Sequence, residues 1–384
     1  MIGLREKYSE KDKISAKKIK EAFEFRNEKS PYYIFTPAYW LFGDDADYIP
    51  EDYCGEDPQS MIDIQLEKIE NHYQNFKEDC YMGYFMPWYG TAVLASGFGT
   101  KIGFGYKMDP AADMSEIKFP EEIDKLKMPD PYNDGLMPRA LNAIKRFKDY
   151  CDLPITLTDC QGPLTTALSI IGYSNFIYWM YDYPEKIHKL MDIVSDAYID
   201  WVKLQKDLIG MRYEDEITFM GIKMPEGSGG ICLSDDDCLI FGAEQYKEFV
   251  MPYNSKIFNA FGGGGLHFCG AATHHLDNFT NTDGLTCLNN INMDDLEGAA
   301  LLKKALDKKN IPLILCDFPP SDDRLEAYYD DLFRLIPQKG TLVVSYITPI
   351  IGLDKGKYVS IKRDKMLLSK RIESIIINKR EEYL

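Results

Sequence analysis

Short apolar segments alternate along the chain with longer segments whose apolar residues recur at helical spacing. The apolar segments lie near residues 32, 81, 153, 217–231, 265, 285, 312 and 341. One of the helical stripes between them consists of Ile187, Leu190, Met191, Val194 and Tyr198. Eight short buried strands that alternate with helices predict an α/β fold, the (β/α)8 TIM barrel, in which the functional groups follow the strands.

The N-terminal residues form a separate segment in this pattern. Residues 1–30 are polar, with a short apolar stripe at Ile19, Ala22 and Phe23, and are predicted to form a helical extension that packs on the rest. Residues 31–384 are predicted to form a single barrel domain. Two helix starts are expected from capping-box spacing, at Asp182 with Glu185 and at Asp294 with Glu297.

Composition narrows the classes of partner. The net charge of −17 over 384 residues argues against nucleic acid and anionic membranes as partners, because both favour positively charged proteins.

The charged N-terminus and the lack of any 18-residue apolar run predict a cytoplasmic protein without a membrane span. The 9 cysteines, odd in number and scattered, indicate reduced thiols. The 26 Tyr and 20 Phe are typical of a pocket for a small molecule.

A glycine-flanked segment, Gly262–Gly270, carries the first candidate chemistry. Its His267 and Cys269 are two residues apart in a predicted strand, so their side chains point to the same face. Imidazole and thiolate are zinc ligands, and a catalytic zinc ion needs only three protein ligands. The alternative is a buried cysteine beside a hydrogen-bonded core histidine.

Other polar and aromatic residues follow the remaining strands. Asp235 and Asp236 come directly after a short apolar strand and are candidate catalytic acids, although a solvated turn would explain them as well. A set of residues at strand ends is expected to form the substrate site: Tyr39, Trp40, Trp88, Tyr89, Gln161 and Tyr346.

Several of these segments together resemble the uroporphyrinogen decarboxylase superfamily. They are Gln161–Ala167, Pro184–His188, Leu233–Asp236 and Leu266–Gly270. The resemblance implies a (β/α)8 barrel and one of two activities: decarboxylation of a porphyrinogen, or zinc-dependent transfer of methyl groups between corrinoid cofactors and thiols or small methylated substrates. The decarboxylase branch implies arginines after the first strand and a late histidine, and the segments 36–40 and 345–349 contain neither.

The methyltransferase branch resembles the chain at His267 and Cys269 and implies a third zinc ligand, a cysteine after the last strand. Ser345 stands there, so Cys316 at the end of the seventh strand is taken as the third ligand, with Asp235 or Asp236 as the alternative. The resemblance also implies a corrinoid (cobalamin). Because the chain has no Asp-x-His-x-x-Gly signature, we expect a partner protein to carry the corrinoid. The amphipathic terminal helices leave room for a homodimer.

Two other functions stay open at this point. One is a decarboxylase-like lyase that acts on another carboxylate, although Arg324 is the single obvious arginine near a strand end. The other is a metal-free ligand-binding barrel, since a fold does not determine its function. His274 and His275 follow Cys269, and at most one of them is expected to reach the site.

Overall fold

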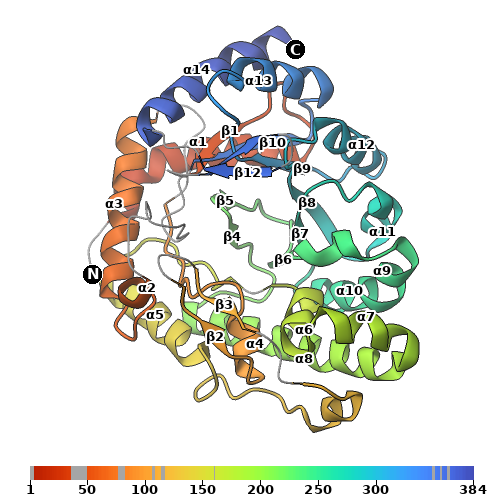
Figure 1. Cartoon of the computed structure of the whole chain (residues 1–384). Helices are drawn as coiled ribbons and strands as arrows, with labels where there is room; N and C mark the ends of the chain where they lie inside the picture. The colour runs from red at the N-terminus through yellow and green to blue at the C-terminus, as the bar shows by residue number, and fades with distance from the viewer. Residues whose placement is uncertain are drawn as a thin grey trace.

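A curved parallel sheet lies at the centre of the computed structural model, and helices surround it (Figure 1). The structure describes residues 4–35, 50–76, 83–105, 109–113, 117–159, 161–347, 351–354, 357–360 and 364–384. The sheet has six strands in the order β1-β10-β9-β8-β7-β6. These strands are β1 (Tyr32–Phe35), β6 (Ile231–Ser234), β7 (Gly264–Cys269), β8 (Leu285–Ile291), β9 (Leu313–Asp317) and β10 (Thr341–Tyr346).

Two further segments continue the barrel wall through single bridges. Phe85 pairs in parallel with Ile155, and Gln161 pairs in parallel with Ser234 of β6. These segments fall where the second and third strands are predicted. The predicted (β/α)8 barrel is therefore confirmed, with a regular ladder on one side and a loosely bridged wall on the other.

The larger helices lie outside the sheet, and their apolar stripes face it. They are α1 (Arg5–Phe23), α3 (Gln59–Asn75), α5 (Met137–Tyr150), α6 (Pro163–Ile171), α7 (Tyr173–Asp182), α8 (Pro184–Ile209), α9 (Ala243–Phe249), α10 (Met251–Ala260), α11 (Leu276–Asn281), α12 (Leu296–Asp307), α13 (Leu325–Leu335) and α14 (Lys365–Glu382). Short helices complete them: α2 (Pro50–Tyr53), α4 (Val93–Gly97) and the 3-10 helices η1 (Pro120–Lys125), η2 (Asp236–Ile240) and η3 (Thr273–His275). Helix α1 confirms the predicted N-terminal extension.

The region 217–231 does not form one barrel strand. Two short antiparallel strands, β4 (Thr218–Phe219) and β5 (Ile222–Lys223), make a hairpin that lies in the middle of the ring (Figure 1). Its turn residues Met220 and Gly221 have positive φ angles of 42° and 83°, as a type I′ turn requires. The barrel strand of this region is β6. Two other hairpins, β2 (Ile102–Gly103) with β3 (Ala111–Ala112) and β11 (Ile351–Asp354) with β12 (Lys357–Ser360), are separate two-stranded sheets.

Both capping-box predictions are wrong by one residue. Asp182 is the last residue of α7, and the N-cap of α8 is Tyr183, which makes no side-chain capping bond. At α12 the cap is Asp295, whose carboxylate accepts a hydrogen bond from the Gly298 amide at 2.8 Å. Asp294 and Asp295 are adjacent, and the sequence pattern does not distinguish which of the two caps the helix. Helix α7, which fills the space before α8, was not predicted.

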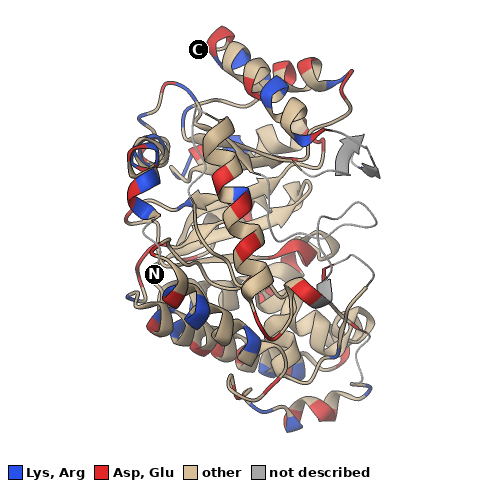
Figure 2. Ribbon diagram, turned by 90° about the vertical axis from the view of Figure 1, so that its left-hand side faces the viewer, with Lys and Arg blue, Asp and Glu red and all other residues tan. Residues whose placement is uncertain are grey.

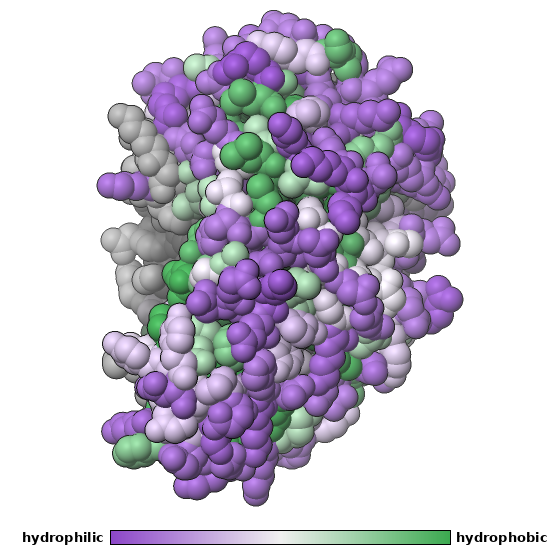
Figure 3. Space-filling view, turned by 90° about the vertical axis from the view of Figure 1, so that its right-hand side faces the viewer, coloured by the Kyte–Doolittle hydropathy of each residue, from purple (hydrophilic) through white to green (hydrophobic). Residues whose placement is uncertain are grey.

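The surface is consistent with the strongly acidic composition. Charged residues lie mostly on the outer helices, and the strands inside carry few of them (Figure 2). On another side, apolar residues form a band among hydrophilic ones (Figure 3). In the described part of the chain, no helix combines the length and apolar character that a membrane crossing needs.

Candidate metal centre

Strand β7 brings the histidine and the cysteine together, as the alternation of its residues predicts. His267 and Cys269 point to the same face, and the Cys269 Sγ lies 3.7 Å from the His267 Nε2. His267 is 2% exposed, so this imidazole is enclosed by protein. The phenyl ring of Phe219, from the β4–β5 hairpin, packs edge-on against it with 6.0 Å between the ring centres. The hairpin therefore shields one side of the histidine.

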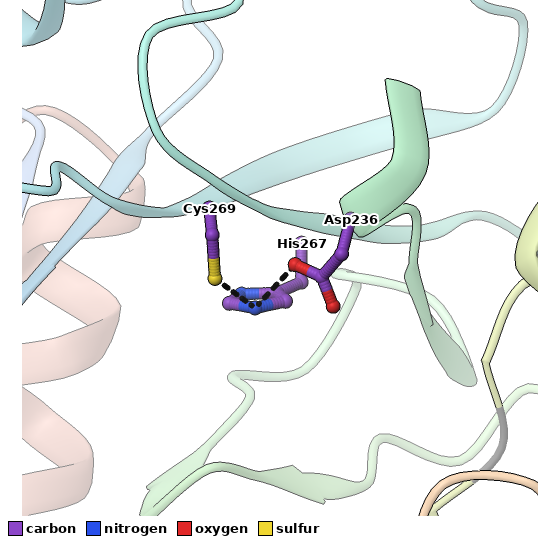
Figure 4. Close-up of side chains that lie close together, drawn as sticks. All are labelled: Asp236, His267 and Cys269. Carbon is purple, nitrogen blue, oxygen red and sulfur yellow. Dashed lines mark hydrogen bonds and ion pairs between the residues drawn. The ribbon is translucent and has the colours of Figure 1, made fainter. Parts of the chain in front are cut away.

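A carboxylate from the neighbouring strand completes a set of three candidate ligands. Asp236 follows β6 as the first residue of η2, and its Oδ1 lies 3.4 Å from the His267 Nε2. One ligand atom of Asp236, one of His267 and one of Cys269 all lie within 4.8 Å of one another (Figure 4). Among the described residues, no other group of His, Cys, Asp and Glu side chains has its ligand atoms this close together.

Asn289 on β8 determines which histidine nitrogen faces this group. Its Oδ1 lies 2.5 Å from the His267 Nδ1, and a carboxamide oxygen can only accept a hydrogen bond. The proton of a neutral imidazole is therefore on Nδ1. The Nε2 lone pair then points toward Cys269 and Asp236. Such orientation by a neighbouring hydrogen-bond acceptor is typical of histidines that bind metals.

The chemistry of the three donors fits a zinc ion. Imidazole nitrogen, thiolate sulfur and carboxylate oxygen are its usual ligands. The Asp236 Oδ1 is buried and makes no hydrogen bond among the described residues, so this oxygen has a free lone pair for a cation. Burial raises the pKa of the Cys269 thiol well above its usual value, and the nearby Asp236 adds to the effect. A cation bound by the three residues would instead lower the pKa of the Cys269 thiol.

The structure does not place Cys316 in the group of three. Its buried thiol accepts a 3.4 Å hydrogen bond from the Asn289 Nδ2, and burial raises its pKa to about 12. Cys316 therefore helps to hold the amide that orients His267. Ser345, at the position where the resemblance implied a cysteine, faces the other side of β10 and lies 2.8 Å from the Tyr329 hydroxyl.

Asp235, the other predicted catalytic acid, faces helices α9 and α10. Its Oδ2 accepts hydrogen bonds from the Tyr246 hydroxyl at 2.5 Å and from the Asn254 Nδ2 at 3.1 Å. Complete burial raises its pKa to about 7, and the hydrogen bonds from Tyr246 and Asn254 partly oppose the rise. Its backbone amide donates to the His267 carbonyl at 2.7 Å, which ties the start of η2 to β7. These contacts suit a group that positions Asp236.

The predicted substrate residues are only partly gathered. Trp88 lines a small cavity beside the hairpin, together with Phe219 and Met220. Tyr346 donates to the Met220 Sδ at 3.4 Å, so it contacts the hairpin from β10. The Tyr89 hydroxyl instead reaches the Gly55 carbonyl at 3.5 Å. Tyr39 and Trp40 lie outside the described residues. Gln161 pairs with Ser234 of β6.

Comparison with known proteins finds similarity to one family and to methyltransferases. Residues 51–208 match the family model described as uroporphyrinogen decarboxylase (URO-D). A methylated-thiol–coenzyme M methyltransferase of Methanosarcina mazei is 26% identical over 207 residues, which are 52% of this chain and 50% of the relative. The solved structure of a methyltransferase from Methanosarcina mazei superposes with a TM-score of 0.64 at 15% identity, over 96% of this chain and 98% of the other.

The resemblance to the uroporphyrinogen decarboxylase superfamily is confirmed. The sequence match spans about half the length of the curated relative, and the structural likeness at this low identity concerns the fold alone. The family match ends within α8, before β6 and β7. The three candidate ligands therefore lie outside the matched region, and their roles depend on geometry.

Other residues considered from the sequence lie away from the three ligands. The His275 Nε2 is 2.9 Å from the Cys238 carbonyl, and the His274 Nε2 is 3.0 Å from the Phe241 carbonyl. Arg324 pairs with Asp294 at 3.1 Å. The sequence reasoning overlooked Asn289, although an asparagine inside a buried apolar strand was a visible signal, because a buried amide needs partners.

Proposed function

We propose that this protein is a zinc-dependent methyltransferase that moves a methyl group between a small methylated substrate or thiol and a corrinoid bound to a partner protein. The grouping of Asp236, His267 and Cys269 at the strand ends of the barrel is the observation that carries the proposal. The name of the 26% identical relative, a methyltransferase that acts on methylated thiols, supports the reaction class. The corrinoid partner and a cytoplasmic location are part of the proposal and rest on the sequence.

Three protein ligands suit a catalytic metal rather than a structural one. Asp236, His267 and Cys269 would hold the ion, and the fourth position of a tetrahedral zinc site would remain for substrate. A zinc ion bound there would supply Lewis acidity, which lowers the pKa of a thiol and makes an ether or thioether a better leaving group.

The surrounding residues prepare this site without taking part in bond changes. Asn289 keeps the proton on the His267 Nδ1 and leaves Nε2 as the ligand atom. Asp235 holds the start of η2 through Tyr246 and Asn254, and so fixes the backbone from which Asp236 projects. Phe219 covers the imidazole and excludes water from one side of it. An apolar enclosure strengthens the interaction between a metal and its anionic ligands.

Metal content tests the proposal and identifies the third ligand. The protein would be purified without chelator under reducing conditions, and its zinc measured by plasma mass spectrometry for the wild type, His267→Ala, Asp236→Ala and Cys316→Ala. We expect about one zinc ion per wild-type chain, as three protein ligands imply. The ion should be lost in His267→Ala and Asp236→Ala and retained in Cys316→Ala.

Two outcomes would contradict the proposal in different ways. A wild-type protein that takes up no zinc after reconstitution would remove the metal mechanism. Zinc retained in Asp236→Ala but lost in Cys316→Ala would make Cys316 the third ligand. Methyl transfer from a methylated thiol to free cob(I)alamin, which forms methylcobalamin and releases the thiol, would then test the reaction itself through the absorbance change of the corrinoid.

A further inference from the structure

Four polar residues on adjacent barrel strands occupy one row. Gln161 pairs with Ser234, Ser234 pairs with His267, and His267 pairs with Asn289. Residues that are paired in parallel register point to the same face of a sheet. His267 faces Phe219 of the central hairpin, so the whole row faces the barrel interior. We call these four residues the inner row.

The two halves of the inner row differ in their hydrogen bonds. His267 and Asn289 bond to each other. The Gln161 Oε1 and the Ser234 Oγ are buried, and neither has a hydrogen-bond partner within the described part of the chain. Buried polar groups nearly always have a partner. The position of these two atoms beside His267 points to a ligand that supplies one.

The backbone is arranged to bring these two residues together. The Gly162 amide donates to the Ser234 carbonyl at 2.6 Å. A Cβ at Gly162 would lie 2.9 Å from that same oxygen, so a larger residue would push the segment away from β6. Glycine at this position therefore keeps Gln161 within reach of Ser234. Thr158, three residues earlier, also has a buried hydroxyl without a partner among the described residues, and it lines the cavity.

A cavity next to the inner row is lined by Phe219, the residue that packs on His267, and its described walls are mostly apolar. Its walls include Trp88, Tyr198, Phe219 and Met220, and no Lys or Arg is among its described lining residues. A buried carboxylate or sulfonate needs a cationic partner to offset the loss of hydration. The described walls offer a single charged group, Asp159, which would repel an anion.

We propose that Ser234 and Gln161 bind the polar group of the substrate, and that this substrate is a small uncharged methylated compound with one hydrogen-bonding group. Ser234 is adjacent to His267 in register, which places the bound molecule next to the three candidate ligands. Phe219 and Trp88 pack against its apolar part. The assignment of the methyl group as the reacting part rests on the proposed function, whereas the selectivity of binding does not.

Three thioethers of similar size separate the features of such a substrate. The first, 2-(methylthio)ethanol, is uncharged and carries a hydroxyl. The second, methyl propyl sulfide, has a methyl group in place of that hydroxyl. The third, 3-(methylthio)propanoate, is an anion. Dissociation constants would be measured by isothermal titration calorimetry on the full chain, both zinc-loaded and metal-free.

The variants are Ser234→Ala and Gln161→Leu, with Ser345→Ala as the control. Ser345 is also a buried serine at the end of a barrel strand, but it faces outward and bonds to Tyr329. We expect the wild type to bind 2-(methylthio)ethanol about tenfold more tightly than methyl propyl sulfide, since a polar site rejects a ligand that leaves it unpaired. Ser234→Ala and Gln161→Leu should each remove most of this preference, and Ser345→Ala should retain it.

Each result has a defined meaning. Equal affinity of the wild type for the first two thioethers, or an unchanged preference in Ser234→Ala and Gln161→Leu, would overturn the assignment. Tight binding of 3-(methylthio)propanoate would overturn the claim that the substrate is uncharged. Selective binding by a protein that holds no zinc would support this inference while contradicting the zinc mechanism, so the two failures are distinguishable.

Discussion

Two buried polar clusters lie at the strand ends of this barrel, on opposite faces of its wall. One is the inner row with Asp236 and Cys269. The other, which we call the outer cluster, lies between the sheet and helix α13 and consists of Asn292, Asp317, Tyr328, Tyr329 and Ser345. In the outer cluster, the Tyr329 hydroxyl lies 2.8 Å from the Ser345 Oγ, and the Asn292 Nδ2 donates to the Tyr328 hydroxyl at 2.9 Å.

The residues of the two clusters are buried to nearly the same extent. The clusters differ in how many of their polar atoms have hydrogen-bond partners. Ser234 and Ser345 are both 1% exposed or less. Helix α13 supplies hydroxyl groups to the outer cluster, where the Asp317 Oδ2 is the one buried side-chain atom without a partner among the described residues. The inner row leaves two buried atoms without a partner among the described residues, next to three possible metal ligands. The unsatisfied atoms of the inner row indicate a ligand site because they also lie beside possible metal ligands.

The largest expected effect comes from removing a candidate ligand. Cys269→Ala should lower zinc affinity by more than about 100-fold, because a lost ligand costs more than a lost orienting partner. Cys151→Ala, which removes another buried thiol, should leave the affinity unchanged. Competition with a chelating dye measures both. Equal affinities in the two variants would exclude Cys269 as a ligand.

A smaller effect is expected from the residue that orients the histidine. Asn289→Ala should weaken zinc binding by about 10- to 100-fold, because the His267 Nδ1 loses its acceptor. Asn292→Ala is the matched change in the outer cluster, since its amide bonds to Tyr328 instead. The same dye competition applies, and a comparable loss in both variants would contradict the distinction between the clusters.

The outer cluster should affect stability and its dependence on pH. Complete burial raises the pKa of Asp317 to about 7, while hydrogen bonds from Ser345 and Tyr329 partly oppose the rise. The folded protein thus keeps a proton that the unfolded chain loses above about pH 4. The stability linked to that proton is present below pH 4 and is lost as the pH rises toward 7.

Asp317→Asn removes this titration with little change in shape. Relative to the wild type, the free energy of unfolding of the variant should therefore rise between pH 4 and pH 7, by about 3 kcal/mol. Urea denaturation at several pH values measures the difference. A difference between the two proteins that stays constant with pH would show that Asp317 does not titrate in this range.

The smallest effect is expected from a hydroxyl of the outer cluster. Tyr329→Phe removes the group that contacts Ser345 and Asp317, and should lower the free energy of unfolding by about 1 kcal/mol. Zinc content and thioether binding should not change. A loss of zinc in this variant would mean that the outer cluster supports the metal centre through the barrel wall.

Much of the fold and half of the candidate metal centre were predictable from local patterns. Helical spacing predicted α1 and α8, and alternation in β7 predicted that His267 and Cys269 face the same way. Helix α7 was overlooked because it directly precedes α8, and the apparent cap at Asp182 was its last residue. The hairpin was overlooked because two strands of two residues each leave no clear alternation.

The sequence by itself determined the strand and helix types and the direction of side chains within one strand, because these depend on periodicity over a few residues. Only the tertiary structure decided which residues meet across strands. The choice between Asp236 and Cys316, and the outward direction of Ser345, depend on register and on the curvature of the closed sheet. The partner of each polar atom follows from that register, and no local pattern contains it.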